Sequence, residues 1–196
     1  KARGRAAHAG LAHADGVNAI AALAVVVQRV EAITDYRLGV TLNVGLIRGG
    51  TSTNTVPGEA CCEIDARYEQ PEDQERVVKA LQAAIDAPMP DRLQGTAFEL
   101  SGGFHRLTMQ PTPENRALMR RYAVHARAAG LGAEEAPLQG GGSDANILAS
   151  HGIPCIDGLG PAGSGVHQTS EQCNLTNLHA KTLALHRFLL TVPPAR

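Results

Sequence analysis

Apolar residues recur with two different periods in the first hundred positions of the chain. In residues 17–33 they return every three or four positions, which is the spacing of an amphipathic helix. Residues 38–47 and 59–68 alternate between apolar and polar side chains, as half-buried strands do. The inward positions expected for the helix are Val17, Ile20, Ala21, Ala24, Val27, Val30 and Ile33.

A second helix and two shorter strands complete this half of the chain. Pro71 suits a first helical turn, acidic residues follow it, and Pro88 prevents continuation, so a helix is predicted over 71–86. Residues 1–7 and 96–100 are predicted as short strands. The order strand, helix, strand, strand, helix, strand is typical of a ferredoxin-like split βαβ sandwich, an α+β domain with its helices on one face of an antiparallel sheet.

The pattern changes to α/β alternation after about Pro111. Helices are predicted over 114–129, 144–150 and 175–190, and short strands over 135–138 and 153–156. The inward positions expected for the last helix are Leu178, Leu185, Phe188 and Leu189.

These elements predict an α/β protein of two domains, the ferredoxin-like one over residues 1–106 and a second over 107–196. Two strands are too few for an α/β core. The second domain is therefore expected to be the C-terminal half of a larger domain whose other half precedes Lys1.

Composition and charge argue against several classes of function. Hydrophobic residues make up 43% and charged residues 19% of the chain, as in soluble globular proteins. The net charge is −1, and there are no Trp, three Tyr and three Phe residues. Neither a basic stripe nor an aromatic platform for nucleic acid is visible. The longest apolar run, 19–27, is too short to span a membrane, and no signal peptide is evident.

The four cysteines, Cys61, Cys62, Cys155 and Cys173, lack the spacing of a structural zinc site. Cys61 and Cys62 are neighbours in a predicted strand, so their side chains should point to opposite faces. Unpaired cysteines are the simpler interpretation. They favour a reducing compartment, and we expect the protein to be cytoplasmic.

Two glycine-rich loops carry residues that could take part in chemistry. His167 lies in a loop with polar neighbours, where an imidazole can bind a metal, although a catalytic zinc takes three protein ligands. Gly141, Gly142 and Ser143 form either a tight turn before a capped helix or a loop that contacts substrate. They lack the arrangement of a phosphate-binding loop.

Three polar residues of the first domain have a structural and a functional interpretation. His8 follows a strand and stands near Gly10, where it could stabilise an oxyanion or simply be solvated. Asn54 suits turn chemistry, and Arg67 suits a surface ion pair. The residues alone leave these alternatives open.

Six ordered motifs resemble a known family over essentially the whole chain. They are His8-Ala9-Gly10, Gly16-Val17-Asn18-Ala19, Thr53-Asn54-Thr55-Val56-Pro57, Asp65-Ala66-Arg67, Gly140-Gly141-Gly142-Ser143-Asp144-Ala145 and Gly165-Val166-His167. Together they resemble the glutamate carboxypeptidase branch of the di-zinc exopeptidase and deacylase family, with acetylornithine deacetylase and succinyl-diaminopimelate desuccinylase as relatives. The resemblance implies a zinc-binding α/β catalytic domain interrupted by a ferredoxin-like lid that forms a homodimer.

The resemblance also implies a role for each residue. His167 resembles the family's final zinc ligand, and His8 resembles the lid histidine that reaches the partner subunit's active site and stabilises the oxyanion. Asn54, Arg67 and Arg106 resemble the residues that hold the substrate carboxylate, a task that suits a guanidinium fork. Gly141, Gly142 and Ser143 resemble the loop that lines the substrate pocket. The substrate class implied is a small peptide or an N-acyl amino acid.

The family's other zinc ligands and its general base all lie before the lid, and this sequence contains none of them. The chain is therefore expected to be a fragment of a zinc-dependent carboxypeptidase or amidohydrolase, with two zinc ions in each complete site and an incomplete site here. One alternative is a non-catalytic dimerisation module. Another is a ferredoxin-like regulatory domain that binds a small ligand.

Overall fold

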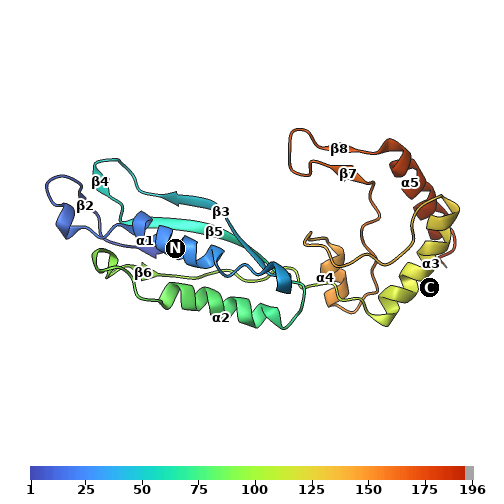
Figure 1. Cartoon of the computed structure of the whole chain (residues 1–196), viewed down its shortest axis with the longest axis horizontal. Helices are drawn as coiled ribbons and strands as arrows, with labels where there is room; N and C mark the ends of the chain where they lie inside the picture. The colour runs from blue at the N-terminus through green and yellow to red at the C-terminus, as the bar shows by residue number, and fades with distance from the viewer. Residues whose placement is uncertain (193–196) are drawn as a thin grey trace. The chain divides into compact units, whose positions relative to one another are not determined.

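A computed structural model of the chain describes residues 1–192. The chain divides into two compact units, Lys1–His105 and a second from Arg106 onward (Figure 1). The first unit is an α+β sandwich, and the second consists mainly of helices and irregular segments. The predicted α/β class is confirmed.

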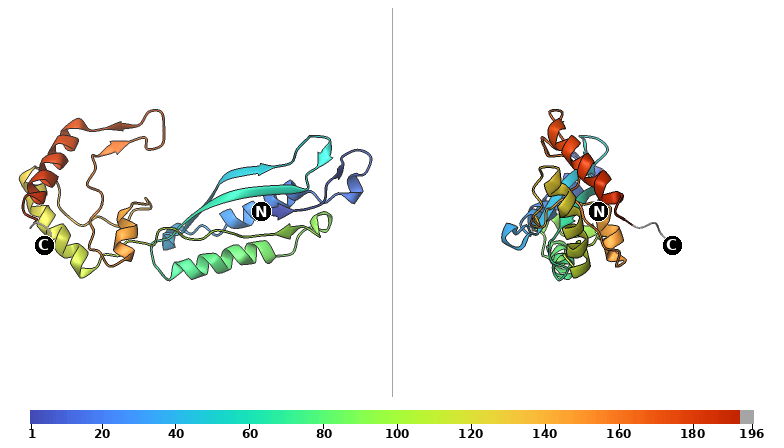
Figure 2. Two further views of the ribbon diagram at one scale, coloured as in Figure 1. Left: turned by 180° about the vertical axis from the view of Figure 1, so that it is seen from behind. Right: turned by 90° about the vertical axis from the view of Figure 1, so that its right-hand side faces the viewer.

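The first unit is built on a four-stranded antiparallel sheet in the order β3-β5-β1-β6. Two helices, α1 and α2, pack on it (Figures 1 and 2). Val26 of α1 and Val77 of α2 share one buried cluster with Leu42 of β3, so both helices cover the same face. The bounds are β1 (Ala2–Arg3), α1 (Ala19–Glu31), β3 (Thr41–Gly49), β5 (Glu59–Arg67), α2 (Asp73–Asp86) and β6 (Ala97–Phe98).

Two short ribbons and three single helical turns were not predicted. One antiparallel ribbon joins β2 (Ala7–His8) to β4 (Thr55–Val56), and another joins β7 (Gly163–Ser164) to β8 (Gln172–Cys173). The 3-10 turns are η1 (His13–Asp15), η2 (Tyr36–Leu38) and η3 (Asp91–Leu93). Strands of two residues are too short to produce a recognisable period in the sequence.

The buried face of α1 differs from the predicted one. The buried residues are Ala19, Ala22, Leu23, Val26 and Val30, whereas Ile20 and Ala24, expected inside, are exposed. Residues 19–27 are all apolar, so periodicity alone does not define which side faces the sheet. Small side chains decide which side of α1 faces the sheet, because Ala19 and Ala22 let the helix approach the strands closely and are both fully buried.

The carboxyl end of α2 is capped by an arginine from α1. Arg29 Nη1 donates hydrogen bonds to the carbonyl oxygens of Ala84 at 3.2 Å and Ala87 at 3.0 Å, and Nη2 donates to Pro88 at 2.6 Å. A positive charge at a helix C-terminus also interacts favourably with the helix dipole. One side chain therefore ties the ends of both helices together.

We expect Arg29→Met to lower the free energy of unfolding by about 1–3 kcal/mol, because it keeps the aliphatic stem but leaves carbonyl groups without their charged donor. Urea denaturation followed by circular dichroism measures the change. Arg76→Met is the matched control, because Arg76 pairs with Asp73 at 3.1 Å within α2 and such pairs contribute about 0–1 kcal/mol. Similar losses in both variants would contradict the capping role.

The second unit has its core between α3 (Pro113–Ala128) and α5 (Leu175–Leu189), with the short helix α4 (Ala145–Ser150) beside its glycine-rich loop. Tyr122 and Ala126 of α3 pack against Ala184 and Phe188 of α5. The rings of Tyr122 and Phe188 meet edge to face, with their centroids 5.8 Å apart.

The strands predicted over 135–138 and 153–156 are wrong, because neither segment pairs with another strand. Pro137 and Pro154 each remove a backbone donor from the segment. The N–H of Cys155 instead donates to the buried side chain of Asn115 at 2.9 Å. A side chain from α3 thus replaces the neighbouring strand that the sequence pattern led us to expect.

The second unit covers part of the apolar surface of the last helix. Phe188 is buried and Leu185 packs against the core, as predicted. Leu178 and Leu189 were also expected inside, but they are exposed, Leu189 to 57%. Leu175, at the start of the helix, is 72% exposed. A substantial apolar surface of α5 therefore remains uncovered in this unit.

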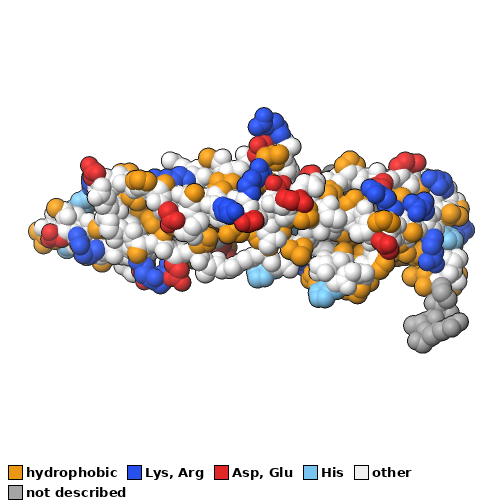
Figure 3. All heavy atoms as spheres, turned by 90° about the horizontal axis from the view of Figure 1, so that it is seen from below, with side chains coloured by type: hydrophobic (Ala, Val, Ile, Leu, Met, Phe, Trp, Pro, Cys, Tyr) orange, Lys and Arg blue, Asp and Glu red, His pale blue; other side chains and the backbone are white. Residues whose placement is uncertain are grey.

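Charges of both signs are interspersed over the face shown in Figure 3. In the first unit, the sheet face opposite the helices carries ion pairs, including Arg48 with Glu63 at 3.0 Å and Arg3 with Glu99 at 2.9 Å. Each helix within residues 1–192 is too short or too polar to cross a membrane.

Candidate functional site

His8 and Asn54 are neighbours at one end of the first unit. The β2–β4 ribbon places His8 opposite Thr55, and the N–H of Ala9 donates to the carbonyl oxygen of Asn54 at 2.9 Å. Both side chains are exposed. Two residues that are 46 positions apart in the sequence therefore share one surface.

The loop after His8 determines which nitrogen of its neutral imidazole ring carries the proton. Nδ1 accepts hydrogen bonds from the backbone N–H groups of Gly10 at 3.1 Å and Leu11 at 3.0 Å. A ring nitrogen that accepts carries no proton, so the neutral imidazole holds its proton on Nε2. The exposed ring therefore presents Nε2–H as a hydrogen-bond donor.

Asn54 is oriented by the turn that precedes β4 (residues 50–54). The Ser52 hydroxyl donates to Asn54 Oδ1, and the backbone N–H of Asn54 is 3.4 Å from Ser52 Oγ. With its oxygen turned toward Ser52, the carboxamide has its Nδ2 donor group on the other side. A donor at this position suits an anionic group.

Arg67 lies at the opposite end of the same sheet. It pairs with Thr41 in the β3–β5 ladder, whereas Gly49 pairs with Ala60 next to the end that holds Asn54. The ladder from Thr41 to Gly49 has eight steps of about 3.3 Å, or about 26 Å in all. Arg67 and Asn54 of one copy are therefore too far apart to bind one carboxylate.

The guanidinium of Arg67 is held by a carboxylate on its own strand. Asp65 Oδ2 accepts from Nη2 at 2.7 Å and from Nε at 3.1 Å. This hydrogen bond raises the pKa of Arg67 above its ordinary value, so the group stays charged. It offers a fixed positive charge on the sheet face opposite the helices.

In the second unit, Arg106 lies beside the glycine-rich loop. Its Nη2 pairs with Asp144 Oδ1 at 2.9 Å, and a Cβ at Gly142 would lie 3.7 Å from Arg106 Cδ. Ser143 Oγ accepts from the N–H of Ala145 at 3.1 Å, which orders the start of α4. Arg106 and the loop Gly141–Ser143 are therefore brought together.

His167 stands at the tip of the β7–β8 ribbon. Its φ of 65° places it in the left-handed region, where it is alone among the non-glycine residues of 1–192. Histidine is one of the side chains that tolerate this region. The ring is exposed, and the turn is closed by a hydrogen bond from Gln168 N–H to the Gly165 carbonyl at 2.9 Å.

Within residues 1–192, no three His, Cys, Asp or Glu side chains gather in a way that could hold a metal ion. A catalytic zinc takes three protein ligands. His167 alone does not meet that requirement. The described residues therefore do not fit a zinc site by themselves.

The outer backbone edge of β3 is divided into a covered half and an uncovered half, and the sequence analysis did not predict this division. Its first half is covered by the segment that follows α1. Asp35 and Val40 exchange backbone hydrogen bonds, and Thr34 Oγ1 bonds both the N–H and the carbonyl of Leu42 at 3.0 and 3.2 Å. Glu31 Oε1 then accepts from the N–H of Val44 at 2.7 Å. The short run of polar residues after the helix was the signal in the sequence for this cover. The backbone groups of β3 that these residues bind cannot be identified from the sequence.

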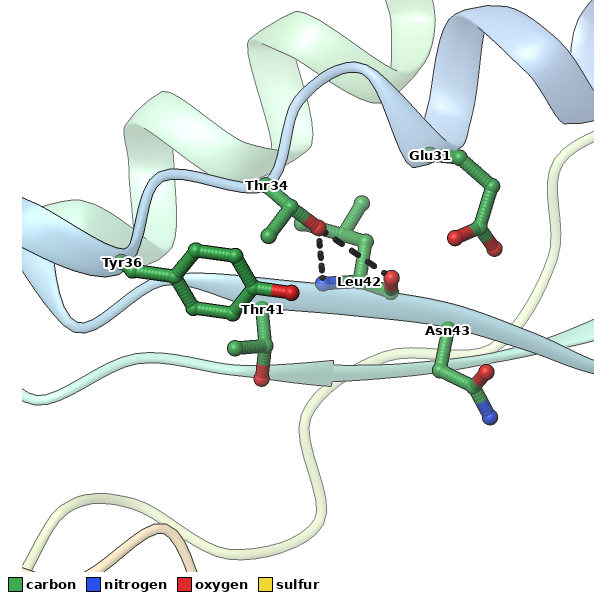
Figure 4. A pocket seen from close by; sticks show the side chains of 6 residues that line it. All are labelled: Glu31, Thr34, Tyr36, Thr41, Leu42 and Asn43. Atoms are coloured by element: carbon green, nitrogen blue, oxygen red, sulfur yellow. Dashed lines mark hydrogen bonds between the residues drawn. The ribbon is translucent and has the colours of Figure 1, made fainter.

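A cavity of about 440 Å³ lies along this covered half of the edge (Figure 4). Thr34 and Leu42 are joined by the hydrogen bonds drawn there, while Tyr36 and Glu31 lie on either side of them. The lining residues are Glu31, Thr34, Tyr36, Thr41, Leu42 and Asn43. We name it the edge cavity.

The second half of the edge, Gly45–Gly49, has no such cover. A bulge between Val44 and Leu46 shifts the register, and beyond it the N–H of Gly50 donates inward to Glu59. Because backbone groups alternate in direction along a strand, Ile47 and Gly49 direct theirs away from β5. The Ile47 side chain is 55% exposed. We name this stretch the open edge.

Comparison with known proteins supports the resemblance in the sequence. Residues 1–92 match the family described as "Peptidase dimerisation domain". The chain is 30% identical to carboxypeptidase G2 of Pseudomonas sp. (strain RS-16), over 84% of this chain and 39% of that protein. It is 31% identical to succinyl-diaminopimelate desuccinylase of Stenotrophomonas maltophilia (strain R551-3), over 71% of this chain and 35% of that protein.

A solved structure of a peptidase also resembles this chain. A tripeptidase from Staphylococcus aureus subsp. aureus Mu50 superimposes with a TM-score of 0.68 and 26% identity, over 95% of this chain and 48% of that one. The chain spans less than half the length of each of these relatives. Residues 1–92 thus match a peptidase dimerisation domain, and the resemblance of the chain to the carboxypeptidase and desuccinylase family is confirmed.

Proposed function

We propose that the chain is part of a zinc-dependent carboxypeptidase or amidohydrolase, of the glutamate carboxypeptidase type, that hydrolyses an amide bond next to a free carboxylate. Residues 1–106 would be its lid and dimerisation domain, and 107–196 the C-terminal part of its catalytic domain. The observation that carries the proposal is the pair His8 and Asn54, which present two oriented donors on one surface of a peptidase dimerisation domain. Its four free cysteines fit the cytoplasm.

Each proposed residue has a chemical task that its surroundings support. His8 Nε2–H would donate to the oxyanion that develops at the scissile carbonyl. Asn54 Nδ2 and the guanidinium groups of Arg67 and Arg106 would bind the substrate carboxylate. Gly141, Gly142 and Ser143 would line the pocket, and His167 would be one zinc ligand, the others lying outside this chain.

The positions of the donors favour a homodimer through the lid. His8 and Asn54 lie at one end of the sheet, and Arg67 lies about 26 Å away at the other. One carboxylate can meet both groups only when two copies contribute. The open edge offers the contact, because an unpaired strand edge with exposed apolar side chains such as Ile47 is a template for strand addition.

The second unit has the surface expected of part of a larger domain. Leu175 and Leu189 of α5 are exposed, and so are Ile147 and Leu148 of α4. Covering such side chains is worth about 25 cal/mol per Å² of apolar surface. This supports the assignment of the second unit as one side of an α/β catalytic domain.

The proposal is tested with the whole protein, an N-acyl glutamate and the same compound with an α-carboxamide in place of the carboxylate. We expect cleavage of the acid and at least about a hundredfold loss of kcat/KM for the amide, because Arg67 and Asn54 would lose an anionic partner. Equal rates for both compounds would contradict carboxylate recognition. Stoichiometric zinc and turnover in the 196-residue chain alone would contradict the assignment of the other ligands to residues outside it.

A non-catalytic dimerisation module is the second candidate. It is favoured by the match of residues 1–92 to a dimerisation domain. The assay above separates the two candidates. A whole protein that forms dimers but cleaves no acyl amino acid and binds no zinc would establish the module and reject the enzyme.

A further inference from the structure

We infer that Asn146 is a positioning residue for recognition of the substrate carboxylate, because its carboxamide holds the segment that carries Arg106 against the glycine-rich loop. The inference rests on the proposed function, in which Arg106 binds that carboxylate, and it adds the residue that sets the position of the guanidinium. Asn146 directly follows the glycine-rich motif, which ends at Ala145. Contacts within the second unit lead to this role.

The carboxamide of Asn146 joins two segments that are far apart in the sequence. Its Oδ1 accepts a hydrogen bond from the N–H of Ser143 at 3.0 Å, and its Nδ2 donates to the carbonyl oxygen of Leu107 at 2.8 Å. Ser143 belongs to the loop, and Leu107 directly follows Arg106. An amide carries an acceptor and a donor on one short side chain, so the two bonds together fix its orientation. Asn146 therefore holds the loop and the Arg106 segment at a set spacing.

The ion pair between Arg106 and Asp144 lies beside this bridge. Arg106 Nη2 is 2.9 Å from Asp144 Oδ1, and the Asp144 side chain is 87% exposed. An ion pair this exposed stabilises little, because water screens both charges and two flexible side chains lose freedom. The half-buried Asn146 is therefore the stronger hold on the backbone of the segment, and the ion pair orients the guanidinium.

Arg106 needs such a hold because it lies where the chain passes from the first unit to the second. The ring of Phe104 packs edge to face on Tyr68 in the first unit, with the ring centroids 5.0 Å apart. His105 alone separates Phe104 from Arg106, which begins the second unit. Residues 99–112 form neither helix nor strand, so side-chain contacts must position the arginine.

The spacing that Asn146 sets determines what the guanidinium can reach. A Cβ at Gly142 would lie 3.7 Å from Arg106 Cδ and 3.8 Å from Nη1, so the backbone of this glycine lies close to the arginine. A Cβ at Gly141 would meet no heavy atom within 4 Å. A carboxylate bound at Nη1 would thus meet backbone without a side chain to obstruct it. A misplacement of about 1 Å in such a site can cost about a hundredfold in rate.

A purely local role for Asn146 makes a different prediction. Ser143 and Asn146 have the spacing of a capping box, in which a side chain of the first helical turn bonds back to the N–H of the capping residue. Ser143 Oγ also accepts from the N–H of Ala145 at 3.1 Å. These bonds stabilise the start of α4 without involving Arg106. The bond to Leu107 is what distinguishes the positioning role.

Limited proteolysis of the whole protein with trypsin tests the bridge itself. Trypsin cuts the bond between Arg106 and Leu107 only when the backbone there opens locally. We expect the fragment that begins at Leu107 to form at least about fivefold faster in Asn146→Ala and in Asn146→Asp than in the wild type. The second variant keeps the acceptor for Ser143 N–H and loses the donor to Leu107. Mass spectrometry of the fragments measures the rate.

Lys181→Met is the matched control, because Lys181 Nζ donates to the carbonyl oxygen of Gly158 at 2.7 Å in the same unit. It should change cleavage after Arg106 less than about twofold. Cleavage at the wild-type rate in either Asn146 variant would overturn the bridge. An equal gain in cleavage after Arg67 would also overturn it, because the variants would then loosen the whole protein.

Kinetics of the whole protein test the role in recognition, with an N-acyl glutamate and its α-carboxamide as substrates. We expect Asn146→Ala to raise KM for the acid at least about tenfold and to change kcat less than about threefold, since binding is lost and the chemical step is kept. Its preference for the acid over the amide should fall about tenfold as well, whereas Lys181→Met should keep all three values. Equal losses for both substrates would overturn the positioning role and leave the proposed function standing. A wild-type protein without preference for the acid would overturn both.

Discussion

Replacing His8 with Ala in the whole enzyme is expected to lower kcat about 10²- to 10³-fold and to leave the zinc content unchanged. Removing one donor to an oxyanion typically costs this much. The donor here is Nε2–H, which is fixed because Gly10 and Leu11 occupy Nδ1. Steady-state kinetics measure kcat, and elemental analysis of the purified protein measures zinc.

His167→Ala is the contrasting variant, and we expect it to lose both zinc and activity, as loss of a metal ligand requires. His13→Ala is the matched control for His8, because His13 is an exposed histidine of the same loop region, in η1. It should keep near wild-type turnover. Zinc loss of the same size in the His8 and His167 variants would contradict the division of roles between the two units.

Mixing two inactive variants of the whole enzyme is expected to restore activity. His8→Ala and Arg67→Ala should each be inactive as homodimers, because each lacks one group in both sites. In a mixed dimer, one site combines the intact His8 of one copy with the intact Arg67 of the other. Random exchange makes half of the dimers mixed, so activity should return to about one quarter of wild type.

The control is a mixture in which both variants carry changes at the same end of the lid. His8→Ala and Asn54→Ala should not complement each other, because both residues come from the same copy at each site. Activity is followed after unfolding and refolding the mixture together. Failure of the first pair to recover would show that His8 and Arg67 do not meet across a dimer.

Much of the fold follows from local pattern. The long strands β3 and β5 and the helices α1, α2, α3 and α5 were all predicted, because each has a clear period or clear end signals. The predictions that were wrong concern features that depend on contacts with other parts of the chain. The all-apolar run in α1 left its inward face undetermined. In the segment 153–156, which was expected to be a strand, the backbone N–H of Cys155 donates to the side chain of Asn115 and not to a neighbouring strand.

The candidate site was predictable as a set of residues but not as an arrangement. The motifs singled out His8, Asn54 and Arg67 together. Sequence spacing could not show that the β2–β4 ribbon joins the first two while the length of the sheet separates the third. Such pairings join residues far apart in the chain, and no local period records them.

The half-covered edge of β3 also limits how far self-association can proceed. An uncovered strand edge can add copy after copy and grow into an open-ended stack. Here Glu31 and Thr34 leave Gly45–Gly49 as the uncovered part of the β3 edge, and one added strand would use all of it. Assembly at this edge would then end at two copies, because no uncovered backbone would remain on β3 to recruit a third.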